Sequence, residues 1–357
     1  MKKVLLISNR VMHYRVSVYN YFHRRFNESG WEFIVRSDEL QKENPYPLDF
    51  DFRSIPFEFW KYKKEIENIR PDAVILFLHL RDRIIWPLFA WLKMKKIPVI
   101  FWTKGLNLDS PDDRLSFALY RFMHRHVDRL ILYSENELKY VKEEHRKKVS
   151  VANNTINFED FPENGQSKEE IKREFGIPFD KVVLSVGRMG ADRQRKKIHH
   201  LVEIFRKSEW NGVGLVIVGS GVPREVQEGM NRNNTIYLGQ VHDSGNVQIS
   251  KIFRMADVFS IPGHVGLGLN QAFYFGLPTV TEEGGQPPEI HYLVDGRNGF
   301  IVPSDNLEEL RNKILYLMEH DEIRKQFGEN ARKDILEHAS VDRMFQGFRN
   351  CLDSLPL

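Results

Sequence analysis

The chain has 357 residues, which is enough for two domains at about 150 residues each. Its 41% hydrophobic, 28% charged and 12% aromatic residues are typical of a globular protein and exclude a disordered or collagen-like chain. The single cysteine, Cys351, excludes an internal disulfide and a cysteine metal cluster, and it favours a cytoplasmic protein.

The net charge of +3 hides an asymmetry between the two halves of the chain. Residues 1–150 hold 28 Lys+Arg against 20 Asp+Glu, whereas residues 151–357 hold 24 against 29. The first half is therefore basic, and it is expected to face something anionic, such as a membrane surface or a lipid phosphate. Because no RNA- or DNA-binding motif accompanies this charge, we expect no nucleic-acid partner.

The first half alternates short apolar runs with longer amphipathic stretches. Runs rich in valine, isoleucine and leucine predict buried strands at 4–7, 33–35, 74–78, 99–102 and 130–133. The stretches between them predict helices at 15–26, 57–69, 83–95, 114–127 and 135–144. Strands that alternate with helices predict a parallel sheet covered on both faces, which is a doubly wound domain.

Aromatic residues alternate with lysines in two of these helices. Residues 60–64 read WKYKK and residues 91–96 read WLKMKK, a pattern typical of interfacial membrane-binding segments. Helices with buried rings and solvated lysines explain the pattern equally well. The longest apolar runs fall far short of the roughly 20 residues that a bilayer-spanning helix needs, so we expect contact with a membrane surface at most.

The second half repeats the alternation of strands and helices. It predicts strands at 182–186, 215–218, 236–238, 258–261 and 279–280, with helices at 198–207, 247–255 and 267–275. The polar, turn-rich stretch 153–168 fits a linker. We therefore predict an α/β protein with doubly wound domains at 1–152 and 153–340, and a last helix at about 341–357 that packs back on the first domain.

Ligands of doubly wound sheets bind beyond the carboxyl ends of the strands, so the residues that follow strands matter most. Gly187 and Arg188 follow one predicted strand, and Lys197 opens the next helix. A glycine lets the backbone approach a ligand closely, and two cations at the ends of one loop can neutralise a diphosphate. A glycine-rich loop at 262–268 then runs straight into a helix, an arrangement that suits a phosphate.

Taken together, these motifs resemble a known family. In order and spacing, Gly187-Arg188, Lys197, VGSGVPREV, YLGQV, ADVFSIPGHVGLGLNQAFYFGLPTV and DGRNGFIVP resemble the C-terminal half of the family 4 (group 1) retaining glycosyltransferases. The resemblance covers most of residues 180–320 and is looser in the first half. It implies the GT-B fold, in which two Rossmann-like domains face each other across a cleft, the first binding the acceptor and the second the nucleotide-sugar.

The resemblance also implies roles for particular residues. Arg188 and Lys197 would bind the donor diphosphate, Gly239 and Val241 would line the base pocket, and the backbone from Gly266 through Leu267 and Gly268 to Leu269 would meet phosphate and sugar. Gly187 would admit the donor. No metal or other cofactor is expected, because two cations and a helix terminus would stabilise the leaving diphosphate.

One departure from the family pattern concerns its pair of glutamates, which lie eight positions apart on this loop and helix. Here those positions hold Gly263 and Gln271, and no acidic residue occurs from 258 to 281. Gln271 can still accept one ribose hydrogen bond, although more weakly than a carboxylate would. His264, Asn270 or Glu289 would take over the sugar contacts, or the donor is altered, and we place His264 with the catalytic candidates.

Three residues of the first half are candidates for acceptor binding. His13 and Arg15 follow the first strand, where the family has a glycine-rich acceptor loop, and Lys104 follows the strand at 99–102. A surface lysine without function explains Lys104 equally well. Asp49 and Asp51 match the D-x-D motif by which another class of glycosyltransferases holds a metal, but three-residue patterns are frequent by chance, so we expect no metal site there.

The sequence therefore predicts a cytoplasmic retaining hexosyl-type glycosyltransferase, working at the inner face of the membrane. Its substrates would be a nucleotide-sugar, UDP-linked by family frequency, and a hydroxyl of a glycan or polyprenyl-diphosphate-linked oligosaccharide in bacterial-type surface polysaccharide synthesis. The alternative is a non-catalytic GT-B partner that has lost the carboxylate pair.

Overall fold

The computed structural model describes residues 1–42, 44–108, 112–189, 193–207, 209–222, 224–228, 234–241 and 245–356. The chain divides into two compact units. The first contains Met1–Asn157 and Ser340–Leu357, and the second contains Phe158–Ala339. The change of unit after Asn157 lies five residues beyond the boundary expected from the sequence.

The first unit is built on a seven-stranded parallel sheet with the order β3-β2-β1-β4-β5-β6-β7. The central strand β1 pairs Val4 with Phe33 on one side and with Ala73 on the other. The strands are β1 (Lys2–Val11), β2 (Trp31–Leu40), β3 (Asp51–Ser54), β4 (Ala73–Phe77), β5 (Val99–Thr103), β6 (Arg129–Leu132) and β7 (Val149–Val151).

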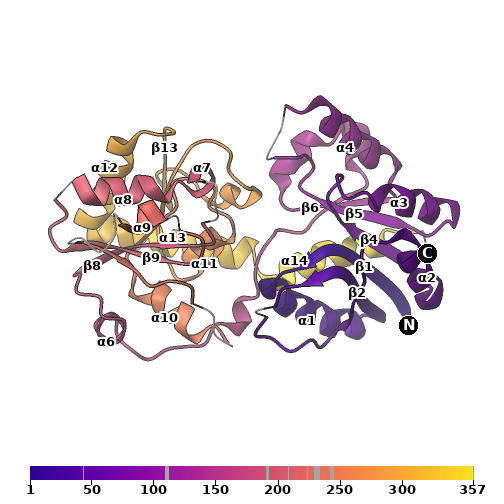
Figure 1. Cartoon of the computed structure of the whole chain (residues 1–357), viewed down its shortest axis with the longest axis horizontal. Coiled ribbons are helices and arrows are strands. Elements are labelled where there is room, and N and C mark those ends of the chain that lie inside the picture. Colours follow the sequence, from indigo (N-terminus) through magenta and orange to yellow (C-terminus); the bar gives the residue numbers. More distant parts are fainter. Residues whose placement is uncertain are drawn as a thin grey trace. The chain divides into compact units, whose positions relative to one another are not determined.

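Helices cover both faces of this sheet (Figure 1). Alternate residues of the strands point to opposite faces; Val4 and Leu6 therefore join the core under α1 (His13–Glu28) and α14 (Val341–Asp353), while Leu5 and Ile7 join the core under the remaining helices. Those helices are α2 (Phe59–Ile69), α3 (Ile85–Met94) and α4 (Arg114–His126). The Asp113 side chain caps α4 by accepting hydrogen bonds from the amides of its first turn.

The second unit has a six-stranded parallel sheet with the order β10-β9-β8-β11-β12-β13. The strands are β8 (Lys181–Val186), β9 (Val213–Val218), β10 (Thr235–Tyr237), β11 (Val258–Ser260), β12 (Thr279–Glu282) and β13 (Gly299–Val302). The helices are α6 (Lys168–Glu174), α7 (Arg193–Lys196), α8 (Ile198–Lys207), α9 (Arg224–Glu228), α10 (Val247–Met255), α11 (Leu267–Tyr274), α12 (Leu307–Glu319) and α13 (Asp321–His338). One core cluster joins α8 and α12 to the sheet.

The doubly wound α/β fold predicted from the sequence is confirmed, but several elements differ from expectation. Strands β3, β7 and β13 were not predicted; each lies at an edge of its sheet, and the sequences of β3 and β7 lack a buried apolar run. The helix expected at 135–144 is a 3₁₀ helix, Glu135–Tyr140, followed by the short helix α5 (Glu143–Arg146). The break falls at Val141, because this residue turns into the core and takes an extended conformation.

Within the residues that the structure describes, we find no helix long and apolar enough to cross a membrane.

Candidate functional site

The loops that follow β8, β9 and β10 pack tightly against one another in the second unit. The amide of Gly219 donates to the carbonyl of Gly239 at 2.7 Å. A Cβ atom on Gly219 would lie 1.8 Å from the carbonyl oxygen of Gly187, so only glycine permits this approach. Glycines, among them Gly187 and Gly239, therefore line the carboxyl end of the sheet. Val241, half-buried, follows in the same loop as Gly239.

Lys196 is the cation that reaches this edge of the sheet. Its ammonium donates to the carbonyl oxygens of His264 and Val265, the latter at 3.2 Å. Two backbone hydrogen bonds run from the loop to the end of α7: the amides of Gly263 and His264 donate to the carbonyls of Lys196 and Arg195 at 3.1 and 2.7 Å. The end of α7 and the loop after β11 are thus joined by four hydrogen bonds.

The position of Lys196 changes its acid–base behaviour. The pKa of Lys196 is lowered to about 8, chiefly by burial; the nearby charges of Arg195 and Arg188 contribute to this lowering, and Glu289 opposes it. Glu289 is buried on the 3₁₀ helix Pro288–Tyr292. Lys196, exposed Arg188 and Glu289 therefore form one electrostatic group beside the glycine loops.

Lys197, the lysine chosen from the sequence, points elsewhere. Its backbone has a left-handed conformation, with φ = +50°. Its ammonium lies 2.8 Å from Glu282, 2.7 Å from the Ser304 hydroxyl and 2.8 Å from Asp305. The structure therefore corrects the prediction: Lys196 lies at the glycine loops, and Lys197 belongs to an ion-pair network.

That network surrounds Glu282, which is fully buried at the end of β12. Besides Lys197, the Nδ1 atom of His200 lies 2.6 Å from its carboxylate, and the amide of Asp305 donates to it at 2.9 Å. These contacts hold the pKa of Glu282 below its usual value against the opposing effect of burial. Sequence analysis missed this network, because no motif connects its residues.

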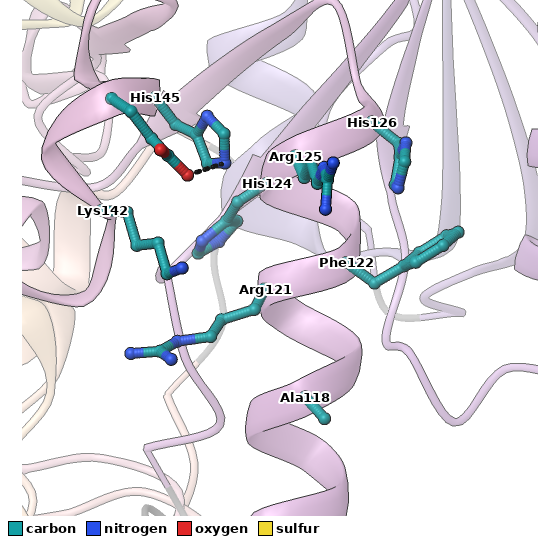
Figure 2. A pocket seen from close by; sticks show the side chains of 9 residues that line it. Ala118, Arg121, Phe122, His124, Arg125, His126, Lys142 and His145 are labelled. Carbon is teal, nitrogen blue, oxygen red and sulfur yellow. Dashed lines mark ion pairs between the residues drawn. The ribbon is translucent and has the colours of Figure 1, made fainter.

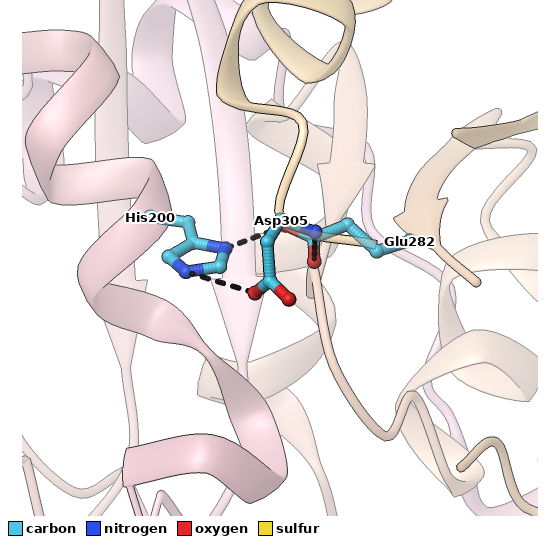
Figure 3. Close-up of side chains that lie close together, drawn as sticks. All are labelled: His200, Glu282 and Asp305. Carbon is cyan, nitrogen blue, oxygen red and sulfur yellow. Dashed lines mark hydrogen bonds and ion pairs between the residues drawn. The ribbon is translucent and has the colours of Figure 1, made fainter. Parts of the chain in front are cut away.

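His200, Glu282 and Asp305 also offer one ligand atom each within 4.8 Å of one another, a spacing that could hold a metal ion (Figure 3). Lys197 already pairs with both carboxylates at 2.8 Å. A metal would have to displace this ammonium, so the donor set fits an ion-pair network better than a metal site.

The structure explains why no carboxylate occupies position 263. A Cβ atom on Gly263 would lie 2.3 Å from the carbonyl oxygen of Arg195, so any side chain would force the loop away from α7. The His264 ring lies beside Gly266, with Nδ1 3.8 Å from the place a Cβ would take there. Glu289 acts electrostatically on Lys196, whose ammonium donates to this loop.

The helix after the loop is α11, and Gly266 is its N-cap residue, with φ = +61°. Leu267, Gly268 and Leu269 form its first turn, and the Leu269 amide already donates to the Gly266 carbonyl at 3.1 Å. Leu269 is buried in the protein, and Asn270 is buried beside it. Gln271 is half-buried one turn along the helix.

In the first unit, the three acceptor candidates lie in different environments. His13 begins α1, and its amide and Nδ1 lie 3.1 and 3.0 Å from the Gln41 side-chain oxygen. Lys104 is half-buried directly after β5. Arg15 is only 3% exposed; it donates to Asn154 at 2.5 Å and lies over the Trp102 ring. This enclosure gives Arg15 a structural role in place of the expected acceptor contact.

The aspartates of the D-x-D motif do not form a free pair of ligands. Asp51 lies on β3 and accepts two hydrogen bonds from the buried guanidinium of Arg36, at 3.0 and 3.1 Å. Asp49 is fixed through its amide, which donates to Asn20 at 3.0 Å. A metal at this motif would compete with Arg36 for the Asp51 carboxylate.

The two segments rich in tryptophan and lysine also differ. Trp91 is buried in the core under α3, as in an ordinary helix. Trp60 is 72% exposed on α2, with the Lys63 ammonium over its ring. Only the first segment therefore presents an aromatic ring to solvent.

Two family models cover most of the chain. Residues 13–160 match "Glycosyltransferase Family 4" and residues 167–334 match "Glycosyl transferases group 1". The chain therefore belongs to the group 1, family 4 glycosyltransferases of the GT-B fold, as its motifs suggested.

Individual relatives have low sequence identity to this chain but match most of its length. The D-rhamnosyltransferase WbpZ of Pseudomonas aeruginosa is 26% identical, with 80% of this chain and 74% of that protein covered. The capsular polysaccharide biosynthesis glycosyltransferase CapM of Staphylococcus aureus is 24% identical, with coverage of 66% and 65%. The solved structure of Anabaena HepE in complex with UDP has a TM-score of 0.80 at 14% identity, covers 99% of this chain and 100% of that chain, and shows the shared fold.

Proposed function

We propose that this glycosyltransferase moves a hexosyl group from a UDP-sugar to a hydroxyl of a glycan or lipid-linked oligosaccharide, with retention at the anomeric carbon. The observation that carries the proposal is the ammonium of half-buried Lys196, which donates to the loop between β11 and α11 and lies next to Gly187. The resemblance to the retaining glycosyltransferases of family 4 supports retention. The UDP bound in the related HepE structure supports the choice of base, and the role of the related CapM supports surface polysaccharide synthesis.

The chemistry would rest on electrostatic stabilisation of the leaving diphosphate. When the glycosidic bond to the donor breaks, negative charge develops on the phosphate oxygen. Lys196 and Arg188 supply two positive charges there, and the first turn of α11 adds the positive end of a helix dipole. We propose that the side chains of His264, Gln271 and Glu289 contact the sugar and ribose. No step requires a metal ion, so we propose metal-independent transfer.

The test is calorimetric titration of the full chain with UDP, GDP, ADP and TDP, in the presence of EDTA. We expect selective binding of UDP that Arg188→Ala and Lys196→Met each weaken by roughly tenfold or more, because each removes a charge-assisted contact. Lys207→Met is the matched control, since this lysine is exposed at the end of α8. It should bind UDP like the wild type.

Each other outcome has a definite meaning. Binding of another diphosphate with the same dependence on Lys196 would replace UDP in the proposal. Binding only after Mn²⁺ or Mg²⁺ is added would reject metal independence. Absence of binding to all four diphosphates would favour the second candidate function, a non-catalytic GT-B partner. The missing side chain at Gly263 is the observation that favours this candidate.

We also propose that the acceptor is carried at an anionic membrane surface. The basic first half and exposed Trp60 support this. Sedimentation with vesicles that contain phosphatidylglycerol, at low salt, tests it. We expect binding that Trp60→Ser reduces, and a protein that stays in the supernatant would reject the membrane-bound acceptor.

A further inference from the structure

A second basic site lies in the first unit, apart from the donor loops. It is a pocket of about 240 Å³ between the last two turns of α4 and the segment that contains α5 (Figure 2). Its polar lining is almost entirely cationic or imidazole; the lining residues are Ala118, Arg121, Phe122, His124, Arg125, His126, Lys142, Glu144 and His145.

The positive charge of this pocket is not balanced by the protein. Among the described residues, no carboxylate lies within ion-pair distance of Arg121, Arg125 or Lys142. Glu144, the single acidic residue of the lining, pairs with His145 at 3.3 Å. Three uncompensated cations around one cavity favour an anionic ligand.

His124 gives the pocket a buried hydrogen-bonding group. The residue is 2% exposed, and its Nε2 atom has no hydrogen-bond partner. Figure 2 shows the ring projecting from α4 toward Lys142, with Arg121 below it and His145 above. Buried polar atoms in native proteins almost always have a partner, so an unpaired Nε2 beside a cavity leaves one hydrogen bond for a water or a ligand bound there.

The charge state of His124 fits an acceptor ligand. Its pKa is lowered to about 4, chiefly by burial and in addition by the neighbouring His145, Lys148 and Arg121. The ring is therefore neutral at pH 7, and with its proton on Nε2 it donates one hydrogen bond into the pocket. The negative end of the α4 dipole is already neutralised, because Lys148 donates to the carbonyls of Arg125 and Val127 at 2.7 and 2.8 Å.

We propose that this pocket binds a phosphate group, held by Arg121, Arg125 and Lys142 and hydrogen-bonded by His124. Arginines match phosphate oxygens in pairs, and several cationic side chains that line one small pocket suit a compact, highly charged anion. The proposal does not rest on sugar transfer, because every residue involved belongs to the first unit. The phosphate can come from a soluble ion or from a lipid headgroup, since Phe122 beside the pocket is 46% exposed.

The test uses the full chain with the Lys196→Met substitution, which weakens phosphate binding at the donor loops, and its readout is the signal of His124 itself. Inorganic phosphate and pyrophosphate are titrated at pH 7.5 while the histidine ring signals are followed by NMR, with His124 assigned from His124→Gln. We expect a saturable shift of the His124 signal, and an apparent Kd that rises at least tenfold in Arg121→Gln. Arg114→Gln is the matched control, because it removes an exposed arginine from the first turn of the same helix.

Vesicles then distinguish the two sources. If phosphatidic acid vesicles bind the protein and Arg121→Gln weakens this binding while Arg114→Gln does not, the pocket takes a lipid headgroup. If both variants bind vesicles like the parent protein while phosphate still shifts His124, the pocket takes a soluble phosphate. A His124 signal that responds to neither phosphate nor pyrophosphate, or an equal effect of the two arginine variants on the Kd for phosphate, would overturn the proposal.

Discussion

Two adjacent lysines have opposite surroundings in this protein. Lys196 reaches backbone carbonyls beside the glycine loops, while Lys197 pairs with two carboxylates. The left-handed backbone of Lys197 separates the two side chains, because it ends α7 and starts α8 in a new direction. Sequence alone places both lysines at the start of a helix and cannot choose between them.

The depressed pKa of Lys196 predicts how donor binding depends on pH. The group carries its charge below a pKa of about 8 and loses it above, so the affinity for UDP should be highest near pH 7 and fall as the pH rises. For a pKa of 8, the charged fraction falls about tenfold between pH 7 and pH 9. We therefore expect about a tenfold increase in Kd over this range, measured by calorimetry.

Lys196→Met provides the control for this prediction. The variant has no titrating ammonium at this position, so it should bind UDP weakly and with little change between pH 7 and pH 9. A slope as steep as that of the wild type would assign the pH dependence to another group.

At the scale of elements, the central strands could be predicted from the sequence and the edges could not. Buried runs such as 74–78 and 99–102 are apolar throughout, because both faces of a central parallel strand are covered. Strand β3 exposes most of its side chains, so its sequence carries no such signal. The glycine loops could be predicted because they are continuous in sequence, whereas the network around Glu282 joins α8, β12 and the loop at 304–305 through tertiary contacts alone.

That network should hold these elements together. Glu282→Gln removes a charge that pairs with Lys197 and His200 in a buried setting, and breaking one partner of such a pair costs about 3–5 kcal/mol. We expect Glu282→Gln to lower the free energy of local opening by about 3 kcal/mol, near the lower end of this range, because Lys197 keeps its ion pair with Asp305. Hydrogen exchange of peptides that span α8 and β12 measures this change in the free energy of local opening.

Glu283→Gln is the matched control for the network. This neighbouring carboxylate is exposed, and its replacement should change the free energy of local opening by less than about 0.5 kcal/mol. Equal protection of α8 and β12 in both variants would contradict a stabilising role for Glu282.

At the scale of the whole molecule, the first unit depends on both ends of the chain. Helix α14 contributes Phe345 and Phe348 to the same core as α1 and the sheet. These two residues lie more than 300 residues after α1 in the sequence. The Phe348 ring lies 4.9 Å from that of Phe22 and 4.8 Å from that of Trp102. The first unit therefore completes its core only when the second unit has been synthesised.

This dependence predicts that a change in α14 destabilises the first unit selectively. Phe348 is fully buried, so Phe348→Ala should lower the free energy of unfolding by about 3–5 kcal/mol through lost burial and a new cavity. Tryptophan fluorescence during urea unfolding reports the unfolding of this unit, because five of the six tryptophans, all but Trp210, lie in it.

Leu115→Ala is the control variant, because this residue is 70% exposed on α4; the substitution should change the free energy of unfolding by less than about 0.5 kcal/mol. If Phe348→Ala had the same fluorescence transition as the wild type, α14 would not contribute to the stability of the core of the first unit.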